Sequence, residues 1–170
     1  MSRARNVADI IKQPFTVTLG TDNYRAGENA GNSIASGGTH NTVIGDEAGT
    51  AITTGDYNVA VGYEALKTED GHGGNVAIGR KALEDLNAGQ NSYNTAVGYN
   101  SGRDVTTGIN NTLIGGETGD ALTDADFNVA VGYNALSGDT KGSKSVAVGK
   151  GALGTQNFTT STDSFNTAVG

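Results

Sequence analysis

The stretch "DYNVAVGYEAL" at residues 56–66 returns as "DFNVAVGYNAL" at residues 126–136, with nine of the eleven letters unchanged. Its central motif, Asn-x-x-aliphatic-Gly, recurs along the chain, and in one copy Ser replaces Asn. The copies are NYRAG 23–27, NTVIG 41–45, NVAVG 58–62, NVAIG 75–79, NTAVG 94–98, NTLIG 111–115, NVAVG 128–132, SVAVG 145–149 and NTAVG 166–170. Successive motif glycines are separated by 17 to 21 residues. A short, nearly constant period indicates a solenoid, in which each coil packs mainly on its neighbours.

The repeat also has a higher order of four coils. From the second copy onward, the second motif position reads Thr, Val, Val, Thr and then repeats this order, so residues 41–98 and 111–170 are two copies of one unit. Extra residues fall in the third coil of each unit, which predicts loops at 87–93 and 155–165. Where the second motif position is Thr, the residue seven positions later is Gly, and where it is Val, that later residue is Leu. Either these two positions touch, or two coil types were duplicated whole.

Each motif predicts a short strand, because its third and fourth positions are both aliphatic. Side chains alternate between the faces of a strand, so one face can point into the coil and the other requires a cover. Another copy of the chain is the natural cover, and the frequent Ala at the third position suggests a close approach there. The core and chain-contact positions predicted in this way are Ile44, Ala60, Val61, Ala77, Ile78, Ala96, Val97, Leu113, Ile114, Ala130, Val131, Ala147 and Val148. We therefore expect an all-β fold, a parallel β-solenoid of about nine coils of ~17 residues, and we expect Ala130→Glu to disrupt assembly.

Two columns of side chains follow from the stacking of coils. The asparagines that open the motifs are expected to form a ladder in which each satisfies an amide of its neighbour. An aromatic residue stands just before the motif in every second coil, so an aromatic corner should recur every two layers, and packing at this corner is a simpler expectation than ligand stacking. The aromatic residues are Tyr57, Tyr93, Phe127 and Phe165.

Composition supports a repetitive rod and excludes several classes of protein. Glycine supplies 27 of the 170 residues, proline one and cysteine none, which excludes a collagen-like chain, a disulfide framework and a Cys-based zinc site. The net charge of −7 argues against a nucleic-acid partner, because phosphate binding requires clustered Lys and Arg. No apolar run approaches the roughly 18 residues of a membrane helix, so we expect no membrane insertion.

Motifs for catalysis are missing. No P-loop, GxSxG or HExxH pattern occurs, and the two histidines, His40 and His72, lie outside any cluster with metal-ligand spacing. Both histidines are expected to be exposed turn residues. An acidic turn that could hold Ca²⁺, but is more simply a solvated corner, contains Glu117, Asp120, Asp124 and Asp126. No coil position is acidic repeatedly, as a polysaccharide-cleaving solenoid would require, so we expect no enzyme and no catalytic, cofactor or metal site.

The phrases "NTAVGYNSG", "NVAVGYNAL" and "NSYNTAVG" resemble the repeats of phage tail fibres and of the heads of trimeric autotransporter adhesins. The resemblance covers roughly residues 21–170. It implies a left-handed parallel β-roll in which three chains associate side by side around a common axis. The adhesin repeat is shorter, and this chain departs from it toward the fibre group.

The opening "MSRARNVADI" resembles the N-terminus of virion fibre proteins of marine cyanobacterial phages. The resemblance implies that residues 1–20 are an attachment segment for phage tail or capsid-vertex proteins, while residues 21–170 form the rod. The alternative is a plain cap that shields the edge of the first coil. The candidate attachment residues are Arg3, Arg5, Val7, Ile10 and Ile11.

These observations lead us to expect a virion structural protein, a homotrimeric tail fibre or appendage on the particle. Its β-roll would be a rigid spacer toward a distal host-binding part. Because the sequence stops within a strand at Gly170, we expect further coils and the receptor-binding part beyond it. The alternatives are the head of a bacterial trimeric surface adhesin, which an export signal upstream would favour, and a glycan-binding or glycan-degrading solenoid.

Overall fold

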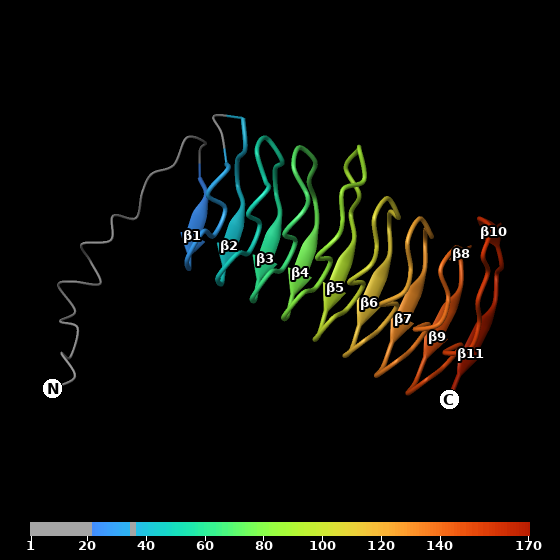
Figure 1. The fold of residues 1–170 in the computed structure, drawn as a ribbon. Helices are drawn as coiled ribbons and strands as arrows, with labels where there is room; N and C mark the ends of the chain where they lie inside the picture. The colour runs from blue at the N-terminus through green and yellow to red at the C-terminus, as the bar shows by residue number, and fades with distance from the viewer. Residues whose placement is uncertain (1–21, 35–36) are drawn as a thin grey trace, which may run out of the picture.

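The computed structural model describes residues 22–34 and 37–170. Nine three-residue strands lie side by side in one parallel sheet, and the chain makes a coil between each strand and the next (Figure 1). The described residues contain no helix. The predicted all-β parallel β-solenoid is therefore confirmed, and its strands recur every 17 to 21 residues. The handedness and the trimer stay predictions of the resemblance.

The main sheet follows the order of the chain. Its strands are β1 Tyr24–Ala26, β2 Thr42–Ile44, β3 Val59–Val61, β4 Val76–Ile78, β5 Thr95–Val97, β6 Thr112–Ile114, β7 Val129–Val131, β9 Val146–Val148 and β11 Thr167–Val169. A second parallel pair joins β8 (Gly142–Ser143) to β10 (Thr162–Asp163). Because β10 lies inside the predicted 155–165 loop, this insertion contributes one strand, which pairs with β8 outside it.

Equal motif positions stack directly on one another. Ala60 pairs with Ala77, and Val61 pairs with Ile78, in perfect motif register. The same register holds at every strand pair of the main sheet, including the pair across the longest insertion, where Val169 lies opposite Val148. The repeat in the sequence therefore becomes a set of side-chain columns along the rod.

The third motif position points into the coil. From Val43 to Ala147 every residue at this position has no exposed surface, whereas the second and fourth positions are at least partly exposed. The Ala side chains thus mark a close approach inside one chain, across the narrow interior of each coil. The interpretation that Ala at this position marks contact between chains is wrong, because Ala130 is enclosed by its own solenoid.

The size of the third motif residue is matched within the same coil in most of the coils. Where that residue is large, as Val43 or Leu113 is, the residue six positions later is Gly49 or Gly119. An added Cβ at Gly49 would lie 3.1 Å from a Val43 methyl carbon, and one at Gly119 would lie 2.9 Å from Leu113. Where the third residue is Ala60, the residue six positions later is a fully buried Leu66. The coil of Ala96 is an exception, because it has Gly102 there, and an added Cβ would meet Leu113 at 2.8 Å and Leu83 at 3.0 Å in the neighbouring coils.

The structure gives no support at Gly49 for a contact between the second motif position and the later Gly or Leu, which was one of the two explanations of their correlation. The atoms nearest to a Cβ at Gly49 belong to Ile52 and Val43, and no Thr42 atom is among them. The backbone has a positive φ at this site in both coil types, +52° at Gly49 and +51° at Leu66. Leucine is strained there, so its burial must outweigh that strain.

The motif asparagines form the expected ladder inside the rod. The side-chain oxygen of Asn41 accepts a hydrogen bond from the backbone N–H of Asn58 at 2.9 Å, and Asn58 does the same for Asn75 at 3.0 Å. The side-chain amide of Asn41 donates to the carbonyl of Gly55, at 2.8 Å on the far side of the coil. The column therefore exists, and the amide satisfied is the backbone N–H of the neighbour. At the first pair, Oδ1 of Asn23 also accepts from the side-chain amide of Asn41 at 3.1 Å.

Candidate assembly surface

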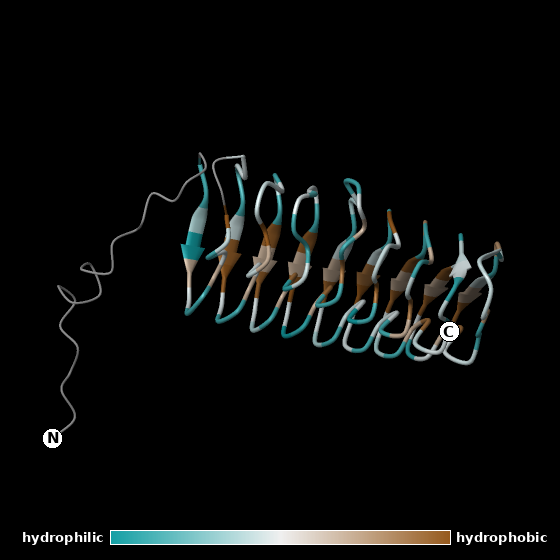
Figure 2. Ribbon diagram, turned by 45° about the horizontal axis from the view of Figure 1, so that its top comes forward, coloured by the Kyte–Doolittle hydropathy of each residue, from teal (hydrophilic) through white to brown (hydrophobic). Residues whose placement is uncertain are grey.

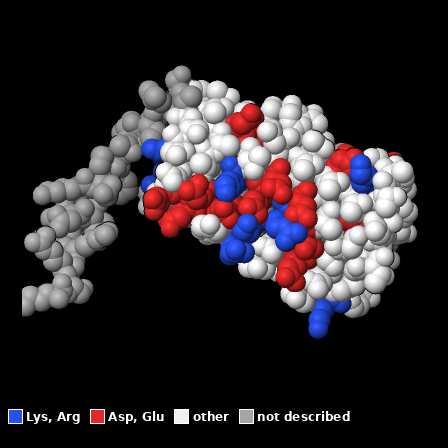
Figure 3. Space-filling view, viewed as in Figure 1, with Lys and Arg blue, Asp and Glu red and all other residues white. Residues whose placement is uncertain are grey.

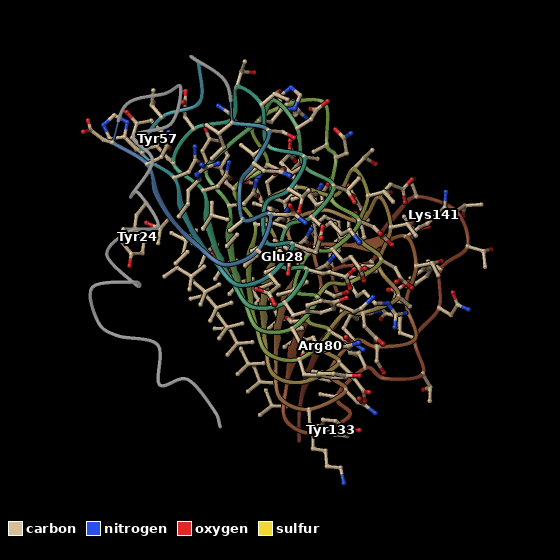
Figure 4. All side chains as sticks on the ribbon, turned by 60° about the vertical axis from the view of Figure 1, so that its left-hand side comes forward. Tyr24, Glu28, Tyr57, Arg80, Tyr133 and Lys141 are labelled. Atoms are coloured by element: carbon tan, nitrogen blue, oxygen red, sulfur yellow. The ribbon has the colours of Figure 1, made fainter. Side chains whose placement is uncertain are left out.

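The fourth motif position forms an apolar row along the outside of the sheet, which we call the outer aliphatic ladder. Its members are Ile44, Val61, Ile78, Val97, Ile114, Val131, Val148 and Val169. They stack in register, and Figure 4 shows a row of carbon-only side chains that passes from strand to strand along the rod. Ile44, Ile78, Ile114 and Val148 are 36–40% exposed. The predicted second apolar face therefore lies on the surface of the single chain.

The outer aliphatic ladder is longer than scattered surface apolar groups would be. It crosses the coils from β2 to β11, and in Figure 2 the main-sheet strands that follow β1 are the most hydrophobic part of the rod. Second-position side chains such as Val59 and Val129 flank it on the same face, and Val129 is 37% exposed. Contiguous apolar surface of this kind marks an interaction site in soluble proteins.

The aromatic residues before alternate motifs lie at a corner, as expected. Tyr57, Tyr93, Phe127 and Phe165 are 51–68% exposed and have positive φ angles. Three of them pack on the residue at the same position in the coil before. The ring of Tyr57 stacks on that of His40 with centroids 4.8 Å apart, and Lys144 lies 5.2 Å above the ring of Phe165. An added Cβ at Gly74 would be 2.6 Å from Tyr93. Corner packing accounts for these contacts.

A second aromatic row follows the motif glycines and was missed by the sequence analysis. Arg80 lies between Tyr63 and Tyr99, with its guanidinium carbon 5.8 Å and 5.4 Å from the two ring centroids. The row continues to Tyr133, which is 51% exposed. Comparison of the residues that directly follow each motif Gly in the sequence would have revealed this row.

Charged side chains gather on another part of the surface, where both signs are mixed (Figure 3). Glu64 pairs with Lys67 at 2.5 Å and with Lys81 at 3.1 Å, and Lys81 also pairs with Glu84 at 2.8 Å. The hydrogen bond from Lys67 is the main cause that lowers the pKa of Glu64. Because the cations here are matched by carboxylates, this surface offers no basic patch for a phosphate backbone.

One group of three potential metal ligands occurs among residues 22–34 and 37–170. It consists of Glu69, Asp70 and His72, whose ligand atoms lie within 4.8 Å of one another. Glu69 is fully buried, and burial raises its pKa, against the opposing effect of His72. The predicted absence of any clustered histidine is therefore wrong for His72. The pattern Glu-Asp-x-His at 69–72, within a single turn, is the signal in the sequence.

The acidic turn considered for Ca²⁺ does not gather into such a group in the described part of the chain. Asp126 instead accepts a hydrogen bond from the backbone N–H of Ile109 at 2.7 Å. Asp124 pairs with Lys141 at 3.4 Å. These carboxylates serve contacts between coils.

The proposed attachment residues Arg3, Arg5, Val7, Ile10 and Ile11 lie outside the described residues. In the part of the chain that is described, no helix has the length and apolar character needed to span a bilayer. No family model, curated protein or solved structure matches this chain.

Proposed function

We propose that this chain is the rod of a homotrimeric virion fibre, with a particle-docking segment in residues 1–20 and coils that serve as a rigid spacer. The observation that carries the proposal is the outer aliphatic ladder, an apolar row on the outside of the rod that residues 22–34 and 37–170 leave partly exposed. The number three and the virion come from the resemblance of the repeats and of "MSRARNVADI" to phage fibre sequences.

The ladder contributes little per residue, and its length compensates for this. Complete burial of a Val or Ile side chain contributes about 1.5–3 kcal/mol, and Ile78 is already covered except for 38% of its surface. Assembly therefore adds on the order of 1 kcal/mol at each rung. Loss of translational and rotational freedom opposes association by several kcal/mol, so several rungs must act together.

The assembly state is tested by measuring the mass of the native chain with light scattering. We expect three times the chain mass of 17.2 kDa. Ile78→Glu places a charge on the ladder and should yield folded monomers, because unpaired charge is costly to bury. Thr107→Glu, at an exposed turn, is the matched control and should stay trimeric. A well-folded wild-type monomer would refute the assembly part of the proposal.

The virion role requires its own experiment. Antibodies raised against the rod should label phage particles in electron micrographs, at the tail or at a capsid vertex. Combined replacement of Ile10 and Ile11 by Asp should remove the label from particles while leaving the mass of the free rod unchanged. Labelling of bacterial cell surfaces in the absence of phage would favour the adhesin instead.

A further inference from the structure

The turn between β3 and β4 carries a carboxylate in an unusual setting. Glu69 has no exposed surface, whereas the side chains of Asp70 and His72 are 54% and 30% exposed. Oε1 of Glu69 lies 3.3 Å from Nδ1 of His72, which in turn lies 3.9 Å from Oδ1 of Asp70. The ligand atoms of the three side chains thus lie within 4.8 Å of one another, and two of the side chains are partly exposed to solvent.

Two atoms of this group have no hydrogen-bond partner. Oε1 of Glu69 accepts a hydrogen bond from the backbone N–H of His72 at 3.1 Å, but the buried Oε2 accepts none. The buried Nδ1 of His72 is also unpartnered, despite its short distance to the carboxylate. The Ala88 N–H favours the charged form of Glu69, yet it makes no hydrogen bond of normal geometry to Oε2. A buried carboxylate oxygen without a partner is costly.

The second copy of the four-coil unit shows how a carboxylate at this position is satisfied by protein alone. Asp139, the counterpart of Glu69, is also fully buried. Its Oδ1 accepts hydrogen bonds from the backbone N–H groups of Gly142 and Phe158, and its Oδ2 accepts one from Nε2 of Gln156 at 2.6 Å.

The first copy lacks that donor and has two potential metal ligands that the second copy lacks. Leu86 stands where the second copy has Gln156, so nothing replaces the bond to the second oxygen. His72 stands where the second copy has Gly142, and Asp70 where it has Thr140. The same three changes remove a hydrogen-bond donor and add two metal-binding groups around one buried carboxylate.

We propose that Glu69, Asp70 and His72 bind a divalent transition-metal ion of the Zn²⁺ class. Imidazole nitrogen and carboxylate oxygen are ligands that Zn²⁺ accepts, at about 2.0–2.2 Å. Two ligands at that distance from one ion are separated by roughly 3–4 Å, which is the range of the 3.3 Å and 3.9 Å separations. Neutral His72 would use its unpartnered Nδ1, and solvent would complete the coordination. The bound ion would fasten this turn between the third and fourth coils.

Titration calorimetry of the full chain with zinc chloride, in a buffer that does not chelate zinc, tests the proposal. We expect one saturable site per chain, and at least tenfold weaker binding in Glu69→Gln and in His72→Asn. Asp139→Asn is the matched control at the repeat-related position, and His40→Asn controls for the second histidine, which lies 3.6 Å from Asp22. Both controls should bind zinc as the wild type does.

Thermal melting keeps the proposal testable if Glu69→Gln folds poorly. Zinc should raise the melting temperature of the wild type, because a ligand bound only by the folded state stabilises it. The increase should vanish in His72→Asn and in Asp70→Asn, whose changed side chains are partly or largely exposed. Absence of saturable binding up to millimolar zinc would overturn the proposal. Equal binding by the wild type and His72→Asn, or loss of binding in His40→Asn, would also overturn it.

Discussion

The side-chain oxygen of Asn94 accepts a hydrogen bond from the backbone N–H of Asn111, 2.9 Å away in the next coil, and both residues are almost completely buried. The side-chain amide of Asn94 also donates to the carbonyl of Gly108 at 2.8 Å. One side chain therefore satisfies two buried backbone groups that belong to no strand ladder. This explains the preference for Asn at the first motif position. At the one exception, Ser145, the shorter hydroxyl instead contacts Ser164 Oγ at 2.6 Å and accepts from Gln156 Nε2 at 3.2 Å.

Asn94→Ala should destabilise the rod substantially. The change leaves the N–H of Asn111 and the carbonyl of Gly108 buried without partners, and each such group costs about 1–3 kcal/mol. Urea denaturation followed by circular dichroism measures the loss. Asn87→Ala is the control, because Asn87 is exposed and should change the unfolding free energy by less than about 0.5 kcal/mol. Similar losses in both variants would show that the asparagine column is not a structural element.

Gly98→Ala should be poorly tolerated, because the motif glycines approach the next coil closely. Gly98 has φ +141°, and an added Cβ would meet the backbone carbonyl oxygen of Gly115. Gly89 also has a positive φ, +70°, but a Cβ there would have no atom within 4 Å. Gly89→Ala should therefore cost only about 1 kcal/mol of backbone strain, and Gly98→Ala clearly more. Thermal melting distinguishes the two, and equal melting temperatures would contradict the close approach.

Ala130 and Val131 are neighbours on β7 that face opposite ways, so the same substitution should have different effects. Ala130→Glu buries a charge inside the coil and should unfold much of the rod, at a cost above about 4 kcal/mol. Val131→Glu lies on the outer aliphatic ladder and should retain the β signal while losing assembly. Glu64→Ala removes a carboxylate that pairs with the partly exposed Lys67 and Lys81, and it should cost less stability than Ala130→Glu because both lysines can still reach solvent. Circular dichroism combined with light scattering separates loss of fold from loss of assembly.

Asp120→Asn should stabilise the rod at neutral pH. Burial is the main cause that raises the pKa of Asp120, and Asp104 and Glu117 raise it further, although Arg103 acts against them. One of its carboxylate oxygens is buried without a partner. A raised folded-state pKa means that the charge opposes folding above that pKa. This penalty disappears as the pH falls through the folded-state pKa of Asp120 toward its unfolded-state pKa of ~3.9.

The measurement for Asp120 is the difference in melting temperature between the wild type and Asp120→Asn from pH 7 to pH 4. The variant should melt higher at pH 7, and the difference should shrink as the pH is lowered. Comparison of the two proteins at each pH removes the contribution of the other acidic groups. A difference that grows on acidification would contradict the raised pKa.

The sequence by itself determined the coil length, the position of each strand and the register between strands. Coils of nearly equal length place equal motif positions above one another, so the pairing of Val61 with Ile78 follows from spacing alone. The asparagine column was predictable for the same reason. The insertions could be located too, because they interrupt a period that is otherwise nearly constant.

Only the tertiary structure decided which strand face lies inside. Alternation along a strand separates Ala60 from Val61, but both are apolar, so the pattern alone cannot distinguish core from surface. The choice depends on how the chain turns at its corners, where residues such as Tyr57 and Leu66 adopt positive φ angles. Such angles cannot be predicted from the residue type, because tyrosine and leucine rarely adopt them. The meeting of Glu69 with His72 depends on the same corner geometry. Local backbone curvature, and not hydrophobic periodicity, therefore sets what this rod encloses and what it presents to a partner.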